Sequence, residues 1–275
     1  MHSASWRLGE CTSPSSRLLA AGATLAALAA PLHAQAYSAP MFACAAFHQS
    51  VDGQVRTELN GTLRLERAGR DGRLLVRSAA ADSGLSASIW WDSLRVWRNA
   101  DGSRIEPSAE GLLGGRYVGT LGVHGGWRGE KVPFIPDDVA AIADLTGVPD
   151  DLLPLLPPRP IPVGATWNGG SGLSVSRLAD STADGHRWWR YSISRKKLHQ
   201  EERDIGGPAL AKIEDSETET GRLTWDALTG PVRWERSIVA ETRIVADPKR
   251  AFRSRLEQRI VLEREGTRPG ECGGP

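Results

Sequence analysis

The centre of the chain carries a proline-rich run, LPLLPPRPIPVGATW (residues 153–167), on which the division of the fold depends. Its prolines fix φ, remove backbone amide donors and push the preceding residues toward extended geometry. Neither an α-helix nor a central β-strand can continue through such a run. We therefore expect a stiff connector between two halves of the chain, with recognition by an SH3-like domain as the functional alternative.

A short helical segment is predicted directly before the connector. Asp137 and Asp138 follow Pro136 and suit the positive end of a helix over residues 137–145. Pro149 then suits the start of one further turn. The chain is therefore predicted to have a helical insert at its centre. The segments on both sides of the insert have a different sequence pattern.

The flanks alternate apolar and charged residues with a period of two, which is typical of half-buried antiparallel strands. In the first half, residues 54–67 are predicted as one strand between turns at Asp52-Gly53 and at residues 69–72. In the second half, residues 232–244 and 251–265 alternate in the same way. The pattern predicts a mainly β fold built from two meanders.

The predicted domain organisation is a leader, one β-rich domain and a tail. Residues 1–36 are predicted as a signal peptide, residues 37–265 as a single domain, and residues 266–275 as a flexible C-terminal tail. Within the domain, the first meander covers 37–133, the helical insert and connector 134–163, and the second meander 164–265.

The N-terminus has the features of a secretory signal. Arg7 and Arg17 precede an apolar run over residues 18–30, and Ala34-Gln35-Ala36 supplies a small-x-small cleavage site. The run is shorter than the roughly 20 residues that span a bilayer, so a retained membrane anchor is the weaker alternative. We expect a periplasmic or secreted protein, cleaved after Ala36, with no transmembrane segment in its mature chain.

The charge balance argues against nucleic acid as a partner. The chain has 34 Lys and Arg against 33 Asp and Glu, and removing Arg7, Arg17 and Glu10 with the leader leaves 32 of each. Nucleic-acid binding depends on phosphate neutralisation and usually shows a basic excess.

Two cysteines remain once Cys11 leaves with the leader. Cys44 lies near the start of the domain and Cys272 near its end. An oxidising compartment favours their pairing as a disulfide, and two free thiols are the alternative. No metal site and no cofactor are expected, because the scattered histidines offer none of the close spacings of zinc ligands.

Catalytic motifs are absent from the sequence, so we lean against an enzyme. There is no Gly-x-Ser-x-Gly elbow and no His-Glu-x-x-His pair. Caps and turns account for the carboxylates that stand close together, which are Asp92, Asp101, Asp137, Asp138, Asp150 and Asp151. An uncharacterised hydrolase is the third functional hypothesis.

The order of elements carries a resemblance to a known class. A first meander, a helical insert, the run PVGATW (162–167) and a closing meander with GRLTWD (221–226) and Thr229-Gly230 resemble uncharacterised exported bacterial β-rich proteins. More distantly, the chain is similar to the lipoprotein carriers of the cell envelope. The resemblance implies a strongly curved antiparallel sheet or half-barrel that wraps a helical insert over an apolar cavity. It also implies lipid binding, but it transfers no individual residue.

The apolar strand faces predict where such a cavity lies. Val55, Leu59, Leu63 and Leu65 are expected to share one face of the predicted strand 54–67. The candidate lining residues are Leu59, Leu63, Leu65, Trp234, Ile238, Ile244, Leu256, Ile260 and Leu262. Small residues interrupt these faces, which leaves a gap or a seat for the insert.

Two non-enzymatic functions follow from these predictions. The first is binding of an apolar or lipid-like ligand in the cavity. The alternative is an envelope scaffold that binds another protein, with Trp90 or Trp91, whichever faces outward, as its anchor. A β protein with no ligand stands beside both hypotheses.

Overall fold

The computed structural model describes residues 36–183, 186–203, 211–247, 250–268 and 270–273, all within one compact unit of residues 33–275. The predicted signal peptide lies outside these residues except for Ala36. None of the helices in the described part of the chain is long and apolar enough to cross a membrane.

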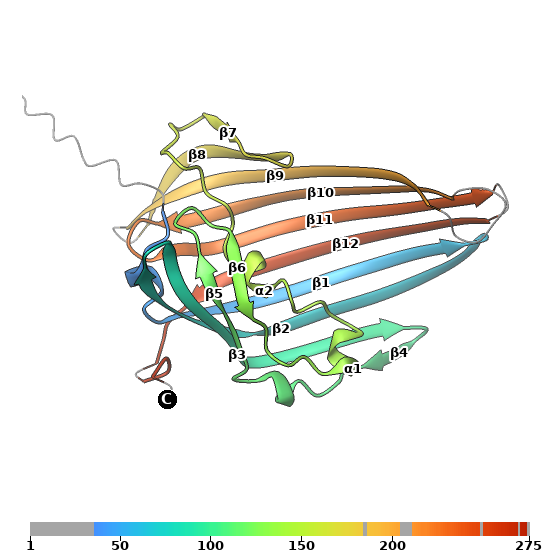
Figure 1. The fold of residues 1–275 in the computed structure, drawn as a ribbon, viewed down its shortest axis with the longest axis horizontal. Coiled ribbons are helices and arrows are strands. Elements are labelled where there is room, and N and C mark those ends of the chain that lie inside the picture. The colour runs from blue at the N-terminus through green and yellow to red at the C-terminus, as the bar shows by residue number, and fades with distance from the viewer. Residues whose placement is uncertain (1–35, 184–185, 204–210, 248–249, 269, 274–275) are drawn as a thin grey trace, which may run out of the picture. The chain divides into compact units, whose positions relative to one another are not determined.

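The fold is one large antiparallel sheet that does not close, which confirms the predicted mainly β class (Figure 1). Its strands run in the order β6-β5-β3-β2-β1-β12-β11-β10-β9-β8-β7, and β4, outside this order, pairs with β3. The strands are β1 (Ala45–Leu59), β2 (Thr62–Ala81), β3 (Gly84–Ala100), β4 (Ser103–Ile105), β5 (Arg116–Leu121), β6 (Trp127–Lys131), β7 (Thr166–Asn168), β8 (Leu173–Ala183), β9 (His186–Arg203), β10 (Ala211–Asp226), β11 (Gly230–Asp247) and β12 (Arg250–Glu265). The helices are η1 (Ala39–Phe42), η2 (Glu110–Leu112), α1 (Asp137–Ala140) and α2 (Val148–Leu152).

The first hairpin differs from the sequence prediction. The turn lies at Asn60-Gly61, where both residues have positive φ (50° and 82°), and Leu59 pairs with Thr62 across it. This is the two-residue Asn-Gly turn that matches the twist of the flanking strands. The prediction of one strand over 54–67 is therefore wrong.

The predicted turns on either side of that strand are also wrong. Gly53, Gly69 and Gly72 lie inside long strands, and at Gly69 and Gly72 the missing Cβ allows close approach of neighbouring groups. A Cβ atom on Gly69 would lie 2.5 Å from the Val51 carbonyl oxygen and 2.6 Å from the Trp97 ring. Gly69 and Gly72 therefore serve packing between strands. The sequence alone does not distinguish such glycines from glycines in turns.

Residues 132–165, here called the crossing segment, span one face of the sheet. The segment joins β6 to β7, and these strands form opposite edges of the sheet. In Figure 1 it passes across the sheet with α1 and α2. Two buried tyrosines fix it, since Tyr37 Oη donates to the Pro154 carbonyl and Tyr117 Oη donates to the Leu145 carbonyl, both at 2.7 Å. We call the covered side of the sheet the inner face.

The main hydrophobic core lies between the inner face and the crossing segment. It combines residues of β1–β3, β5 and β8–β12 with Val139, Leu145, Val148, Leu152 and Leu156 of the segment. Strands near both edges of the sheet contribute to this one core, so the sheet curves around the segment. The predicted half-barrel with a central helical insert is confirmed.

The helix in the crossing segment is shorter than predicted. It was expected over residues 137–145, whereas α1 ends at Ala140. The Asp144 carboxylate accepts from the backbone N and the Oγ1 of Thr146, at 2.9 and 2.6 Å, and such local bonds compete with a helix. Arg70 Nη1 also donates to the Asp144 carbonyl oxygen, at 3.1 Å. The predicted further turn is α2.

The two ends of the domain meet in the middle of the sheet. β1 pairs with β12, with Ala46 opposite Glu265, and a disulfide joins Cys44 to Cys272 across a Cα–Cα distance of 5.6 Å. The predicted pairing of these cysteines is confirmed. The segment around Cys272 covers the outer face of the sheet, and Arg73 holds it by an ion pair with Glu271.

The segment around Cys272 explains how two consecutive tryptophans, Trp90 and Trp91, can both be buried. Trp91 is fully buried in the inner core, and Trp90 faces outward but packs with Leu75 and Cys272 in a small second core. The Arg116 guanidinium covers its ring at 4.7 Å. Neither indole is exposed, so neither can serve as the predicted anchor for a partner protein.

Candidate functional site

A cavity of about 420 Å³ lies between the inner face and the crossing segment. Its apolar walls come from both meanders and from the segment, namely Val51, Val55, Ile142, Ile238, Leu256 and Ile260. Its polar lining includes Arg70, Asp144, Asp151 and Gln258. We call this space the inner cavity. Mixed walls of this kind, mostly apolar with a few polar groups, are typical of ligand sites.

The predicted lining residues fall into four groups. Ile238, Leu256 and Ile260 line the inner cavity. Trp234 and Leu262 are buried in the core beside it. Leu59 and Ile244 point to the inner face at the far ends of the strands, where Phe252 lies between them. Leu63 and Leu65 lie on the outer face and are 59% and 50% exposed.

The displacement of Leu63 and Leu65 follows from the turn at Asn60-Gly61. A two-residue turn inserted into an alternating run changes which positions face inward. In β1 the odd-numbered residues face the core, and in β2 the even-numbered residues do, because Val51 pairs with Arg70. The expectation that Leu63 and Leu65 share a face with Leu59 is therefore wrong.

An ion-paired bridge stands at the polar end of the inner cavity. Arg70 Nη2 of β2 donates to Asp151 Oδ2 at 3.0 Å, and Arg236 Nη2 of β11 donates to Asp151 Oδ1. We call these three residues the Arg70–Asp151–Arg236 bridge. It ties the crossing segment to two strands that are not neighbours in the sheet. Burial lowers the pKa of the Arg70 guanidinium, and the Asp151 carboxylate opposes this shift.

Further buried polar groups extend the bridge along the inner face. Arg70 Nε donates to Gln49 Oε1 at 2.9 Å, and Arg236 Nη1 donates to Glu219 Oε1 at 3.2 Å. Arg195 Nη1 lies 3.8 Å from the second oxygen of Glu219. A second cavity of about 270 Å³ adjoins Arg195, Glu219 and Arg236 on the other side of the bridge. The charged groups therefore separate two cavities of the inner face.

The bridge and the polar side chains around it contain more buried hydrogen-bond donors than acceptors. Gln49 Nε2, Arg195 Nε and Arg236 Nε are buried atoms without a hydrogen-bond partner among the described residues. An unsatisfied buried donor costs roughly 1 to 3 kcal/mol, so native proteins rarely keep several in one place. The excess of donors suits an additional oxygen acceptor.

Sequence reasoning missed all three residues of the bridge. Arg70 was assigned to a turn and Asp151 to a helix cap, whereas both point into the interior. One signal was available, because Arg236 lies between Trp234 and Ile238 on an otherwise apolar face. A lone arginine in such a row predicts a buried, partnered charge. Its partner on the crossing segment could not be read from the pattern.

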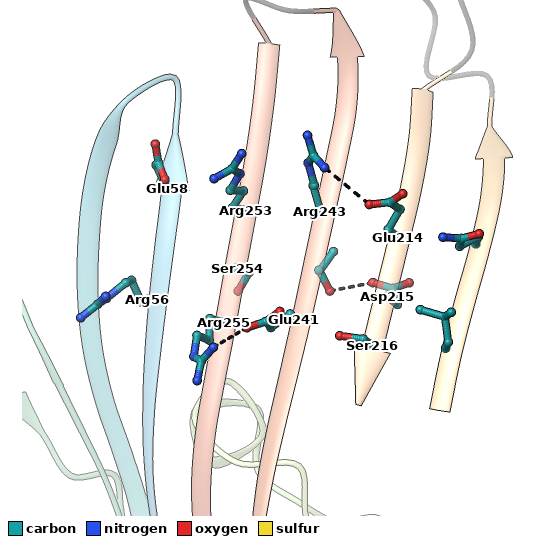
Figure 2. A pocket seen from close by; sticks show the side chains of 13 residues that line it. Arg56, Glu58, Glu214, Asp215, Ser216, Glu241, Arg243, Arg253, Ser254 and Arg255 are labelled. Atoms are coloured by element: carbon teal, nitrogen blue, oxygen red, sulfur yellow. Dashed lines mark hydrogen bonds and ion pairs between the residues drawn. The ribbon is translucent and has the colours of Figure 1, made fainter. Parts of the chain in front are cut away.

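A larger hollow of about 540 Å³ lies at the far ends of the strands, where Arg56, Glu58, Glu241, Arg253 and Arg255 face outward (Figure 2). Its charges largely compensate one another. Arg255 pairs with Glu241, and Arg243 lies 3.7 Å from Glu214. These side chains are about half exposed, and ion pairs of that kind contribute little. We therefore regard the smaller inner cavity, with its buried charges, as the candidate site.

Metal binding has no support in the described part of the chain, where no three His, Cys, Asp or Glu side chains are grouped to hold an ion. Asp138 lies in the first turn of α1 and its carboxylate accepts from the Val139 amide at 3.0 Å, whereas the N-cap position is Pro136, without a side-chain capping hydrogen bond. Comparison with known proteins matched no family model and no curated protein sequence. The site's chemistry must therefore be argued from its geometry.

Proposed function

We propose that the protein is exported to the periplasm or secreted and binds an apolar or lipid-like ligand in the inner cavity. The observation that carries this proposal is the cavity itself, with walls from β1, β11, β12 and the crossing segment. Its volume of about 420 Å³ falls in the range of roughly 300 to 1,000 Å³ that is usual for small-molecule sites.

The inner face beyond the cavity supports a ligand with a long apolar part. Leu59, Phe252, Ile244 and Ile213 form a cross-strand row near the strand ends, and Leu59 is 54% exposed. The ends of β1, β10, β11 and β12 that carry this row extend beyond α1 and α2 (Figure 1). A chain that leaves the cavity would meet apolar side chains there.

Export is supported by the leader-like N-terminus and by the disulfide. Cys44 and Cys272 are bonded, and structural disulfides persist mainly in oxidising compartments. The resemblance to lipoprotein carriers that the order of the elements suggests implies the same location and a lipid-like ligand.

A protein-binding scaffold is the second candidate. Exposed leucines at the far ends of the strands favour it, namely Leu59, Leu63, Leu65 and Leu198. Its predicted tryptophan anchor is absent, since Trp90 and Trp91 are both buried. A scaffold also requires no interior cavity, so we rank it below the carrier.

The test combines ligand extraction with a variant that fills the cavity. Protein purified from the exported fraction is extracted into organic solvent, and co-purified lipid is identified by mass spectrometry. We expect Ile238→Trp to fold and to retain less lipid, because the added ring occupies the cavity.

Leu63→Trp is the matched control, since it adds comparable bulk on the exposed outer face. It should leave both bound lipid and melting temperature unchanged. If Ile238 instead lay in a fully packed core, Ile238→Trp would cost roughly 1 to 3 kcal/mol by overpacking. A lower melting temperature with no change in lipid would contradict the proposal.

A further inference from the structure

We propose that the ligand of the inner cavity is a single-chain amphiphile with a carboxylate head, which binds between Arg70 and Arg236 in place of the Asp151 side chain. The inference rests on the proposed function and specifies its ligand class. Asp151 then acts as an internal competitor that occupies the head-group position when no ligand is bound.

The bridge has the geometry of a carboxylate site. Each oxygen of Asp151 accepts from a different arginine, Oδ2 from Arg70 and Oδ1 from Arg236. The two arginines come from β2 and β11, so the sheet itself sets their separation. A ligand carboxylate at this position would reproduce both contacts.

The arginines are fixed, whereas the aspartate is accessible. The side chains of Arg70 and Arg236 are 5% and 9% exposed, but that of Asp151 is 26% exposed. A rotation of Asp151 toward solvent would leave two buried guanidinium groups facing each other. Arg236 would keep Glu219 as its partner, but Arg70 would have no carboxylate partner among the described residues. Because a buried charge without a counter-charge is strongly unfavourable, the site would bind an anion.

The surplus of donors supports an oxygen-rich head. Of the five N–H groups of Arg70, one donates to Gln49, one to the Asp144 carbonyl and one to Asp151, so displacement of Asp151 leaves three for a ligand. Gln49 Nε2 and Arg236 Nε lack partners within the described ranges. A neutral head with a single acceptor would leave most of these donors unpaired.

The walls next to the bridge determine the rest of the ligand. Arg70 and Asp151 line the inner cavity together with Val51, Ile238 and Ile260. An alkyl chain attached to a carboxylate at the bridge therefore lies against these apolar side chains. Charged and apolar recognition meet in one cavity, which is the requirement for a fatty-acid-like molecule.

The experiment compares myristate with tetradecan-1-ol, which have the same chain length but differ in head-group charge. Delipidated protein is titrated with each by calorimetry near neutral pH. We expect myristate to bind more tightly than the alcohol. Asp151→Asn should tighten myristate binding roughly tenfold by removing the competitor and should leave the alcohol unaffected.

The arginine variants should act in the opposite direction. Arg70→Gln and Arg236→Gln each remove a charged hydrogen bond and should weaken myristate binding roughly ten- to a hundredfold. Asp137→Asn is the control for charge on the crossing segment, because Asp137 is exposed on α1, and it should change neither ligand. If an arginine variant does not fold, Asp151→Asn still decides the question.

The outcomes separate the two proposals. Equal binding of acid and alcohol, or weaker myristate binding by Asp151→Asn, would overturn the carboxylate inference and leave the cavity proposal standing. Tighter binding of tetradecyl phosphate than of myristate would overturn the assignment to a carboxylate. If neither the wild type nor Asp151→Asn binds any of these probes, both proposals fail.

Discussion

A single glutamate in the C-terminal segment should make stability depend on acid pH. Arg73 Nη2 donates to Glu271 Oε2 at 2.8 Å, and the Arg268 amide donates to the same oxygen at 2.8 Å. These bonds, that from Arg73 first, lower the pKa of Glu271 to about 2 from its ordinary value of 4.5. The folded state therefore favours the ionised carboxylate.

The sign of the effect follows from linkage. A carboxylate with a lowered folded-state pKa stabilises the protein fully above its unfolded pKa, and this contribution is lost as the pH falls toward the folded value. We expect Glu271→Gln to unfold at lower urea concentration than the wild type at pH 7. The difference between their midpoints should shrink between pH 4.5 and about 2. An equal difference at pH 7 and pH 2 would contradict this assignment.

Among the elements, the β1–β2 hairpin can be tested through its turn. Gly61 has φ of 82°, and no atom lies within 4 Å of the position where its Cβ would stand. Gly61→Ala should therefore cost only the backbone strain of an L-residue in the left-handed region, roughly 1 to 2 kcal/mol. Equilibrium denaturation measures the change.

Gly170→Ala is the control for this prediction. Gly170 also has open space around it, but its φ is not positive. Its replacement should change the free energy of unfolding by less than about 0.5 kcal/mol, as for most surface positions. Equal losses in the two variants would mean that the hairpin does not turn at Asn60-Gly61.

The same hairpin shows how far pattern reading reaches for an element. Alternation predicted antiparallel strands on both sides of the connector, because period two follows directly from the pleat. It could not choose among the glycine-containing turns, since Gly69 and Gly72 lie in strands where neighbouring groups leave no room for a Cβ, while Gly61 provides a left-handed turn. That choice depends on neighbours from other strands.

For the whole molecule, the class of fold and the disulfide were predictable, whereas the site was only partly so. The apolar rows placed Ile238, Leu256 and Ile260 correctly on one face. The bridge joins β2, the crossing segment and β11, whose sequence separations are 81 and 85 residues. Such non-local contacts leave no periodic signal in the sequence. The one indication of them was Arg236, a single charged residue in an apolar row.

The disulfide between Cys44 and Cys272 joins the two ends of the domain, and its contribution to stability can be tested. The disulfide spans 228 residues and fixes the start of β1 beside the end of β12, in the middle of the sheet. The unfolded chain loses much of its freedom through so long a loop, and the loop-entropy model gives an upper figure of roughly 5.4 kcal/mol. We expect the double replacement of Cys44 and Cys272 by serine to lower the free energy of unfolding by about 2 to 4 kcal/mol in equilibrium denaturation. Reductant should shift the wild type by a similar amount and leave the double variant unchanged, because the variant has no bond to reduce. If Cys44 and Cys272 of the purified wild type could be alkylated without reductant, or if the double variant were as stable as the oxidised protein, the sheet would hold its ends together without the bond.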